Sequence, residues 1–158
     1  MSKIKRFIDH QECIGVNGIY FPDGTVYKLD IKGKLNSLGE ACYLIKLGGE
    51  STIREMEKSD SFYEWNDCAY LFDKSYTNLN ITILAGQSDY GSDGFIAVLD
   101  AQEKNLIWLA FIDCSDPFYK VSIKSDNTIV AESTNGSRWL FPLKSPEKVK
   151  AYPKCEDK

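Results

Sequence analysis

Leu106-Ile-Trp-Leu-Ala-Phe-Ile112 is the stretch of the sequence that decides the fold. All seven residues are apolar, whereas a strand with one face in water alternates apolar and polar residues. The stretch therefore predicts a central β-strand over 105–112 that is covered on both faces, with Trp108 buried and structural. Because the run stops at Asp113, it is far shorter than the ~18 apolar residues that cross a bilayer, and we expect no integral membrane protein.

Strand patterns continue on both sides of this segment. The neighbouring stretches are rich in β-branched and aromatic residues. Turn signals such as Asp23-Gly24, Asp93-Gly94 and Asn135-Gly136 separate them. Their short links favour an antiparallel arrangement with at least six strands. The predicted strands, in chain order, are 18–22, 25–31, 79–85, 94–99, 105–112, 118–124, 127–132 and 137–143.

The segment between residues 37 and 59 carries helix signals. Thr52-Ile-Arg-Glu55 fits a capping box, in which a hydroxyl and a carboxylate satisfy free backbone N–H groups, and predicts a short helix over 52–59. A second such pattern, Ser37-Leu-Gly-Glu40, precedes apolar residues over 38–47 that fit either a helix or a strand. The predicted fold class is mostly β (α+β): an antiparallel sheet, or a partly open barrel or sandwich, with one or two short helices.

Length and composition are those of a single domain. The chain has 158 residues, of which 43% are apolar and 27% charged, and this is enough for one folded core. We expect one domain over 1–158, with a loosely ordered basic C-terminal tail from about residue 144. The five cysteines are odd in number and form no C-x-x-C pair, which predicts reduced thiols and no zinc site. Because the basic N-terminal segment lacks the apolar run of a secretion signal, the predicted localisation is cytoplasmic.

Signals of catalysis are sparse. His10 is the only histidine, so a nucleophile–histidine arrangement would have to use this residue, which lies in a peripheral segment. The glycine-rich motifs that bind phosphates are absent. Carboxylate pairs for glycoside hydrolysis cannot be recognised in a sequence, since their role depends on their separation in space. We therefore expect no enzyme, no cofactor and no metal site.

Charge is unevenly distributed along the chain. Residues 50–116 carry a net charge of −9, whereas the remaining residues carry +5. Aromatic residues interleave the acids, and together they suit a basic protein partner, because aromatic anchors give affinity and acidic groups speed encounter. The same region repels nucleic acid. An ordinary solvated face would also explain the pattern. The predicted partner-binding residues are Asp60, Tyr63, Glu64, Trp65, Asp67, Asp89, Tyr90, Asp93, Asp113 and Asp116.

The segment from Leu106 to Phe118 carries a resemblance to a known group of proteins. Its strand, Leu106-Ile-Trp-Leu-Ala-Phe-Ile112, runs into the polar turn Asp113-Cys-Ser-Asp-Pro-Phe118. Over about 94–142 the chain resembles small immunity proteins of bacterial contact-dependent growth inhibition and related polymorphic toxin systems. The resemblance implies a cytoplasmic, non-enzymatic protein that neutralises a cognate toxin C-terminal domain, often a basic nuclease.

No functional residue transfers from this group of proteins, so the candidate contacts remain those of the charge argument. We expect the acidic, aromatic face to occlude the active site of the toxin. The expected partner is the toxin domain alone, with no direct nucleic-acid binding and no membrane. The alternative is a small-molecule-binding or hydrolytic β-barrel protein, whose cavity a sequence does not reveal.

Overall fold

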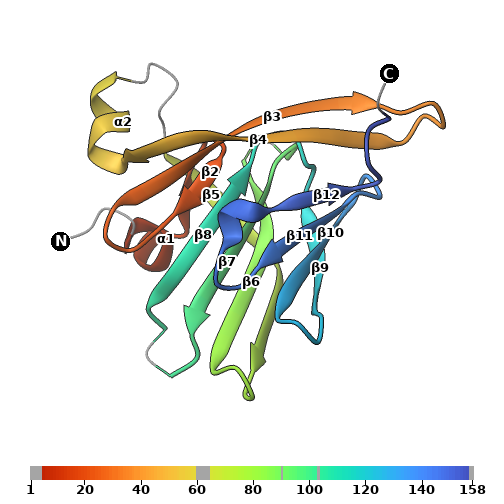
Figure 1. Ribbon diagram of the computed structural model, residues 1–158. Helices are drawn as coiled ribbons and strands as arrows, with labels where there is room; N and C mark the ends of the chain where they lie inside the picture. Colours follow the sequence, from red (N-terminus) through yellow and green to blue (C-terminus); the bar gives the residue numbers. More distant parts are fainter. Residues whose placement is uncertain (1–4, 60–64, 90, 103, 157–158) are drawn as a thin grey trace.

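The computed structural model describes residues 5–59, 65–89, 91–102 and 104–156. In these residues the chain forms two antiparallel sheets, two short α-helices and one 3₁₀-helix (Figure 1). The elements are α1 (Lys5–His10), β1 (Glu12–Ile14), β2 (Gly18–Tyr20), β3 (Thr25–Leu35), β4 (Ala41–Thr52), α2 (Ile53–Ser59), β5 (Trp65–Tyr76), β6 (Ile81–Ser88), β7 (Gly94–Asp100), β8 (Leu106–Ile112), β9 (Phe118–Ile123), β10 (Thr128–Ser133), β11 (Arg138–Pro142), η1 (Pro146–Lys148) and β12 (Lys150–Tyr152).

The strand order confirms the predicted central strand. The larger sheet has the order β1-β5-β6-β7-β8-β2-β3-β4, and the smaller sheet has the order β12-β11-β10-β9. Strand β8 therefore lies inside the larger sheet, hydrogen-bonded to β7 on one side and to β2 on the other. Six of its seven residues are buried, and Ile107 is the exception. The mostly β class is confirmed, and neither sheet closes on itself.

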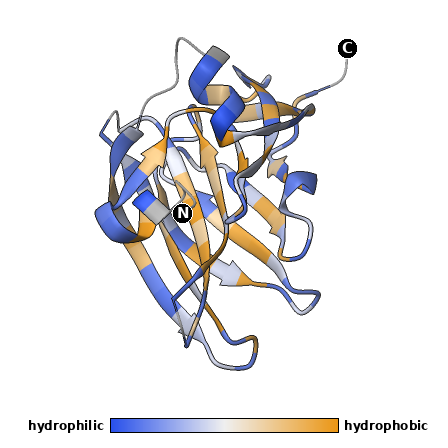
Figure 2. Cartoon of the chain, turned by 90° about the vertical axis from the view of Figure 1, so that its left-hand side faces the viewer, coloured by the Kyte–Doolittle hydropathy of each residue, from blue (hydrophilic) through white to orange (hydrophobic). Residues whose placement is uncertain are grey.

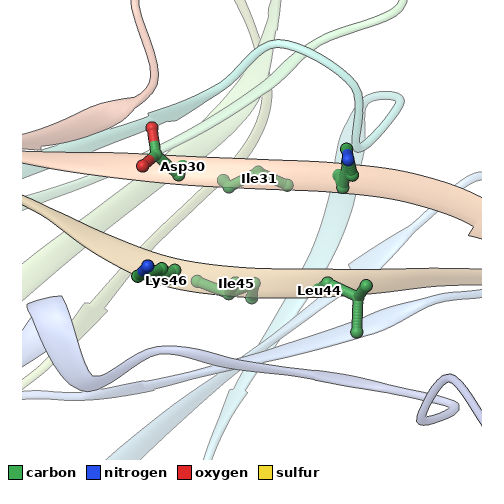
Figure 3. Close-up of a pocket in the computed structure, with 6 residues that line it drawn as sticks. Asp30, Ile31, Leu44, Ile45 and Lys46 are labelled. Carbon is green, nitrogen blue, oxygen red and sulfur yellow. The ribbon is translucent and has the colours of Figure 1, made fainter. Parts of the chain in front are cut away.

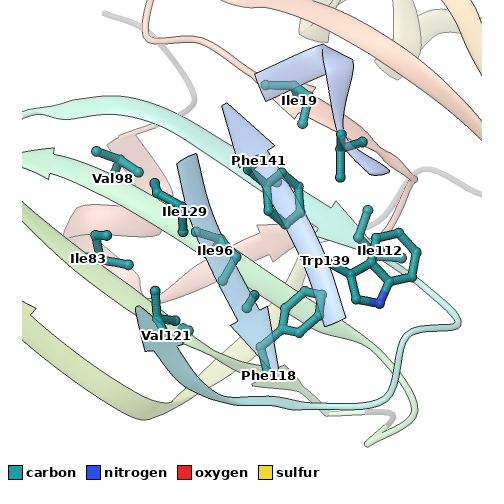
Figure 4. Packing of buried hydrophobic residues seen from close by; sticks show 14 of the residues in the cluster. Ile19, Ile83, Ile96, Val98, Ile112, Phe118, Val121, Ile129, Trp139 and Phe141 are labelled. Carbon is teal, nitrogen blue, oxygen red and sulfur yellow. The ribbon is translucent and has the colours of Figure 1, made fainter. Parts of the chain in front are cut away.

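Both faces of the larger sheet are covered, which explains why β8 is apolar throughout. On one face, Trp108 and Ala110 join the core shared with the smaller sheet, to which Trp139 and Phe141 contribute (Figure 4). On the other face, Leu109 belongs to a second cluster that includes residues of both α-helices. Figure 2 shows the hydrophobic residues concentrated on the strands, with mostly hydrophilic loops around them.

The undecided segment 38–47 belongs to a strand. Strand β4 pairs with β3 from Thr25↔Thr52 to Leu35↔Ala41. The Ser37–Glu40 pattern lies in the turn between these strands, where the Asn36 side-chain oxygen accepts hydrogen bonds from two backbone N–H groups. Residues 29–47 form a long hairpin, called here the arm, which crosses the top of the molecule in Figure 1. The predicted helix over 52–59 is confirmed as α2.

Residues 146–152 pack against the rest of the protein, so the expectation of a loose tail from about residue 144 is wrong for this stretch. Strand β12 pairs with β11, and Val149 and Ala151 are buried in the core between the sheets. These two residues alternate with Lys148 and Lys150, which are exposed. Alternation of period two is typical of a strand with one buried face. The lysines of this segment instead led to the prediction of a solvated basic tail.

The expectation of five reduced thiols is also wrong. Disulfides join Cys13 to Cys68 and Cys42 to Cys155, with Cα separations of 6.3 and 5.2 Å. Both separations lie within the range that a disulfide spans. The partners are 55 and 113 residues apart in the sequence. Their pairing depends on which segments lie side by side, namely β1 beside β5 and the C-terminal segment beside the arm. Cys114 is the free cysteine.

Candidate partner-binding site

Strand register gathers four of the predicted residues at one end of the larger sheet. Cys68 pairs with Ser88, so Asp67 and Asp89 follow at neighbouring positions of adjacent strands. Gly94 pairs with Ile112, so Asp113 leaves the sheet at the same end. The next turn joins it, because the backbone N–H of Asp116 donates to the Ser92 carbonyl at 2.9 Å. The acidic end, as used below, consists of Asp67, Asp89, Asp113 and Asp116.

The acidic end faces solvent. Asp67, Asp89 and Asp113 are exposed, and Asp116 is partly exposed. Within the described part of the chain, no lysine or arginine forms a salt bridge with any of these carboxylates. Asp113 is held by Asn17, whose Nδ2 donates to its Oδ1 at 3.0 Å and whose Oδ1 accepts from its backbone N–H at 2.6 Å. The position of this carboxylate is therefore fixed before any partner binds.

Asp93 does not belong to this surface. Its side chain is 2% exposed. Its Oδ1 accepts the backbone N–H of Ser88 at 2.6 Å, and its Oδ2 accepts the hydroxyl of the same serine. The residue closes the loop between β6 and β7 from inside, and its assignment as a partner contact is corrected.

Of the predicted aromatic contact residues, only Trp65 lies among the described residues. This side chain is partly buried, and the guanidinium of Arg6 lies 4.4 Å from the centre of its ring. Arg6 also pairs with Glu12 at 2.8 Å. These contacts tie α1 to the edge of the sheet, and they give Trp65 a structural role. The remaining predicted residues, Asp60, Tyr63, Glu64 and Tyr90, lie outside the described residues.

Two cavities on the arm were not expected from the sequence. A cavity of about 470 Å³ on the arm is lined by β3 and β4 (Figure 3). An adjoining cavity of about 280 Å³ lies between β4 and the C-terminal segment and shares Leu44 and Ile45 with the first. The apolar residues at every second position, Tyr43, Ile45 and Leu47, were the available signal, but they indicate a sheet surface only once 38–47 is known to be a strand.

The titratable groups beside the acidic end are poorly suited to nucleophilic catalysis. Burial, and next the charge of Asp113, raise the pKa of the Cys114 thiol from 9.0 to about 12. A reactive cysteine requires the opposite shift, because the thiolate is the nucleophile. Burial also raises the pKa of Tyr43, whose hydroxyl donates to the Cys114 carbonyl at 2.8 Å. Among the described residues, no group of three or more His, Cys, Asp or Glu side chains is placed to hold a metal ion.

The fold defines a two-sheet antiparallel β-protein with α-helices against the outer face of its larger sheet. The sequence matches no protein-family model, no curated protein and no solved structure. In the described part of the chain, no helix is long and apolar enough to span a membrane.

Proposed function

We propose that the protein is a non-catalytic immunity protein whose acidic end covers the active site of a basic toxin domain. One observation carries the proposal: the fold collects Asp67, Asp89, Asp113 and Asp116 from three separate segments at one end of the larger sheet. Concentrating like charges opposes folding. A binding role for these carboxylates would account for that arrangement.

The physical basis of inhibition is competition for cationic groups. The active site of a nuclease holds phosphates with lysine and arginine, and carboxylates at the acidic end would occupy the same cations. Encounter would be accelerated by the field of the acidic end and slowed by salt. The pair formed by Asn17 and Asp113 lowers the entropy that is lost on binding, since this carboxylate is already positioned.

The alternative, a small-molecule-binding or hydrolytic protein, is supported by one observation. The cavity of about 470 Å³ on the arm has the volume of a ligand site. However, its lining includes Leu44, which is 48% exposed, and three charged side chains, Asp30, Lys32 and Lys46. Ligand sites usually enclose most of the ligand among apolar residues. We therefore prefer the protein-binding function.

The cytoplasmic localisation expected from the sequence stays part of this proposal, and the disulfides provide its test. Disulfides persist mainly in oxidising compartments. Cells would be quenched with acid and their thiols alkylated, and the oxidation state of the Cys42–Cys155 pair would be read by mass spectrometry. In a cytoplasmic protein this pair would be kept reduced inside the cell, and the disulfide seen in the structure would form only under oxidising conditions. Quantitative oxidation in the quenched cells would place the protein in an oxidising compartment.

The test of function uses charge reversal at the acidic end. The probe is the C-terminal domain encoded by the adjacent open reading frame, made catalytically inactive and studied by stopped-flow fluorescence. We expect the double variant Asp67→Lys/Asp89→Lys to reduce the association rate at least about tenfold at low salt, because both carboxylates are exposed and steer encounter.

The matched control is Asp30→Lys/Glu50→Lys, which changes the net charge equally at exposed positions of β3 and β4. We expect it to change the association rate no more than about twofold. Equal rates for the acidic-end variant and the wild-type protein would refute the proposed surface. A probe that the wild-type protein does not bind would refute the immunity function itself.

A further inference from the structure

The outer edge of the arm is an unpaired strand edge. Strand β4 ends the larger sheet, and its strand partner in the described chain is β3. Strand β12 lies close to β4 but pairs with β11. An unpaired edge presents backbone N–H and C=O groups that another strand can use.

The open part of this edge is short and has defined limits. At one limit, Cys42 is bonded to Cys155, which brings the C-terminal segment against the arm. At the other limit lies Gly49, whose φ of +101° falls beside a shift in the register of the ladder. A bulge of this kind interrupts pairing. Residues 43–47 remain. Strand β12 lies beside residues 43–45 without pairing with them, so an added segment of about five residues, or roughly 17 Å, would enter between β4 and β12.

Apolar side chains flank the open edge. Leu44 and Leu47 are 48% and 52% exposed, although large apolar side chains are usually buried. The adjoining cavity, between β4 and β12, is lined by apolar groups that include Ile45, Val149 and Ala151. Side chains of an added strand would point alternately to its two faces, so every second side chain of the added strand would reach an apolar surface.

The side chains around the open edge are mostly basic, which favours an acidic binding segment. The linings of the two cavities contain Lys32, Lys46, Lys150 and Lys154 but only one acid, Asp30. All four lysines are exposed. A strand that carries acidic residues between its apolar ones therefore complements this surface, whereas a basic strand is repelled.

We propose that residues 43–47 of the arm bind an extended acidic peptide segment of a partner protein by β-strand addition. The surface uses none of the residues of the acidic end. It therefore stands apart from the proposed neutralisation of a basic toxin.

The arm is held in place before a peptide binds. The Asn135 side chain donates to the Tyr43 hydroxyl at 2.7 Å, and this hydroxyl donates to the Cys114 carbonyl. Near the tip, the Ser37 hydroxyl donates to Glu156. A strand added to a rigid edge loses mainly its own conformational entropy, which favours affinity.

The probe is a seven-residue synthetic peptide that alternates glutamate and valine and carries a fluorescent label. Binding to the full chain is measured by fluorescence anisotropy at low salt. We expect saturable binding, and we expect Lys46→Glu/Lys150→Glu to weaken it at least about tenfold, because both lysines line the cavities. The matched control, Lys124→Glu/Lys144→Glu, reverses two exposed lysines that line neither of the two cavities at the arm, and its affinity is expected to stay within about twofold of the wild type.

A second probe separates strand addition from simple charge attraction. The same peptide, N-methylated at alternate residues, keeps its charge but loses backbone donors, and we expect it to bind at least about tenfold more weakly. Circular dichroism of each variant confirms folding. The proposal is overturned by absent binding at 1 mM peptide, by unchanged affinity of the Lys46→Glu/Lys150→Glu variant, or by equal binding of the methylated peptide.

Two further outcomes identify the occupant. A wild-type dimer in sedimentation that Lys46→Glu/Lys150→Glu dissolves would make a second copy the occupant of the edge and overturn the peptide proposal. The variant Asp67→Lys/Asp89→Lys is expected to bind the acidic peptide normally. This result would support the arm site whether or not the toxin proposal holds.

Discussion

Trp108 supports the core through its size and through one hydrogen bond. It is 1% exposed, its ring centre lies 5.9 Å from that of Phe141, and its Nε1 donates to the Leu143 carbonyl at 2.9 Å. We expect Trp108→Ala to lower the free energy of unfolding by about 3–5 kcal/mol, because the cavity left behind would not fill completely. Urea denaturation monitored by circular dichroism measures the loss.

The control for this prediction is an exposed aromatic residue. Tyr119 is 47% exposed, so Tyr119→Ala is expected to change the free energy of unfolding by no more than about 0.5 kcal/mol. A Trp108→Ala protein as stable as the wild type would show that this tryptophan is not the core residue described here.

Cys114 makes stability depend on pH in the alkaline range. Its raised folded pKa, about 12 against 9.0, means that the unfolded chain loses this proton first. The stability that the half-buried neutral thiol contributes is therefore complete below about pH 9 and is lost as the pH rises towards 12. We expect Cys114→Ser to flatten the fall in Tm between pH 8 and pH 11.

Ionisation of Tyr43 also contributes to the fall in Tm at alkaline pH. Its pKa is also raised by burial, so its contribution has the same sign and persists in the Cys114→Ser variant. The expected result is a smaller alkaline fall in Tm and not its disappearance. A variant whose Tm falls as steeply as that of the wild type would rule out ionisation of Cys114 as a cause.

Strand β6 depends on a glycine where β5 comes close. A Cβ added at Gly86 would lie 1.9 Å from the backbone oxygen of Ala69, beside the irregularity between Tyr70 and Phe72. Backbone atoms cannot move away as a flexible side chain does. We expect Gly86→Ala to destabilise the protein by about 1–3 kcal/mol or more in urea denaturation.

The matched variant is Gly48→Ala, at which an added Cβ meets its neighbours at 3.4 Å. A small change in stability is expected there. If the two substitutions proved equally costly, loss of glycine flexibility would explain both results, and the close approach of β5 to β6 would not.

Strands that are bounded by turn residues in the sequence could be predicted. Strands whose position depends on the segments they pair with in space could not. The eight predicted strands correspond to β2, β3 and β6 to β11, because turn residues separate them and their apolar residues fit a sheet. Strand β5 was missed, although Cys68, Tyr70 and Phe72 alternate with more exposed residues. The acids and aromatic residues at its start were interpreted as a binding surface, and no strand was predicted there.

The Cys42–Cys155 disulfide links the larger sheet to the segment that follows the last strand of the smaller one. It closes a loop with a sequence separation of 113 residues. Removal of a native disulfide typically costs about 2–5 kcal/mol, largely because the unfolded chain gains freedom. We expect Cys155→Ser to lower the free energy of unfolding by an amount in this range.

The comparison is made under oxidising and reducing conditions. A reducing agent is expected to destabilise the wild-type protein more than Cys155→Ser, which retains only the Cys13–Cys68 disulfide. Equal stability of the variant and the oxidised wild-type protein would show that this link does not hold the two sheets together.

The candidate site was only partly predictable, because it depends on how distant segments meet. The excess of acids over 50–116 identified the region. The structure then separates Asp67 and Asp89, which are exposed neighbours, from Asp93, which is buried and accepts hydrogen bonds from the serine five residues before it. The exposed leucines of the arm indicate a candidate binding edge only once residues 38–47 are known to lie in a turn and a strand.

The uneven charge distribution affects how the protein is immobilised for binding measurements. Residues 50–116 contain only 4 of the 19 lysines and arginines, and four lysines line the cavities at the arm. Coupling through amines would thus attach many molecules by the arm and leave the acidic end free. Coupling through carboxyl groups would attach many by the acidic end and leave the arm free. The choice of surface chemistry therefore determines which partner a biosensor detects.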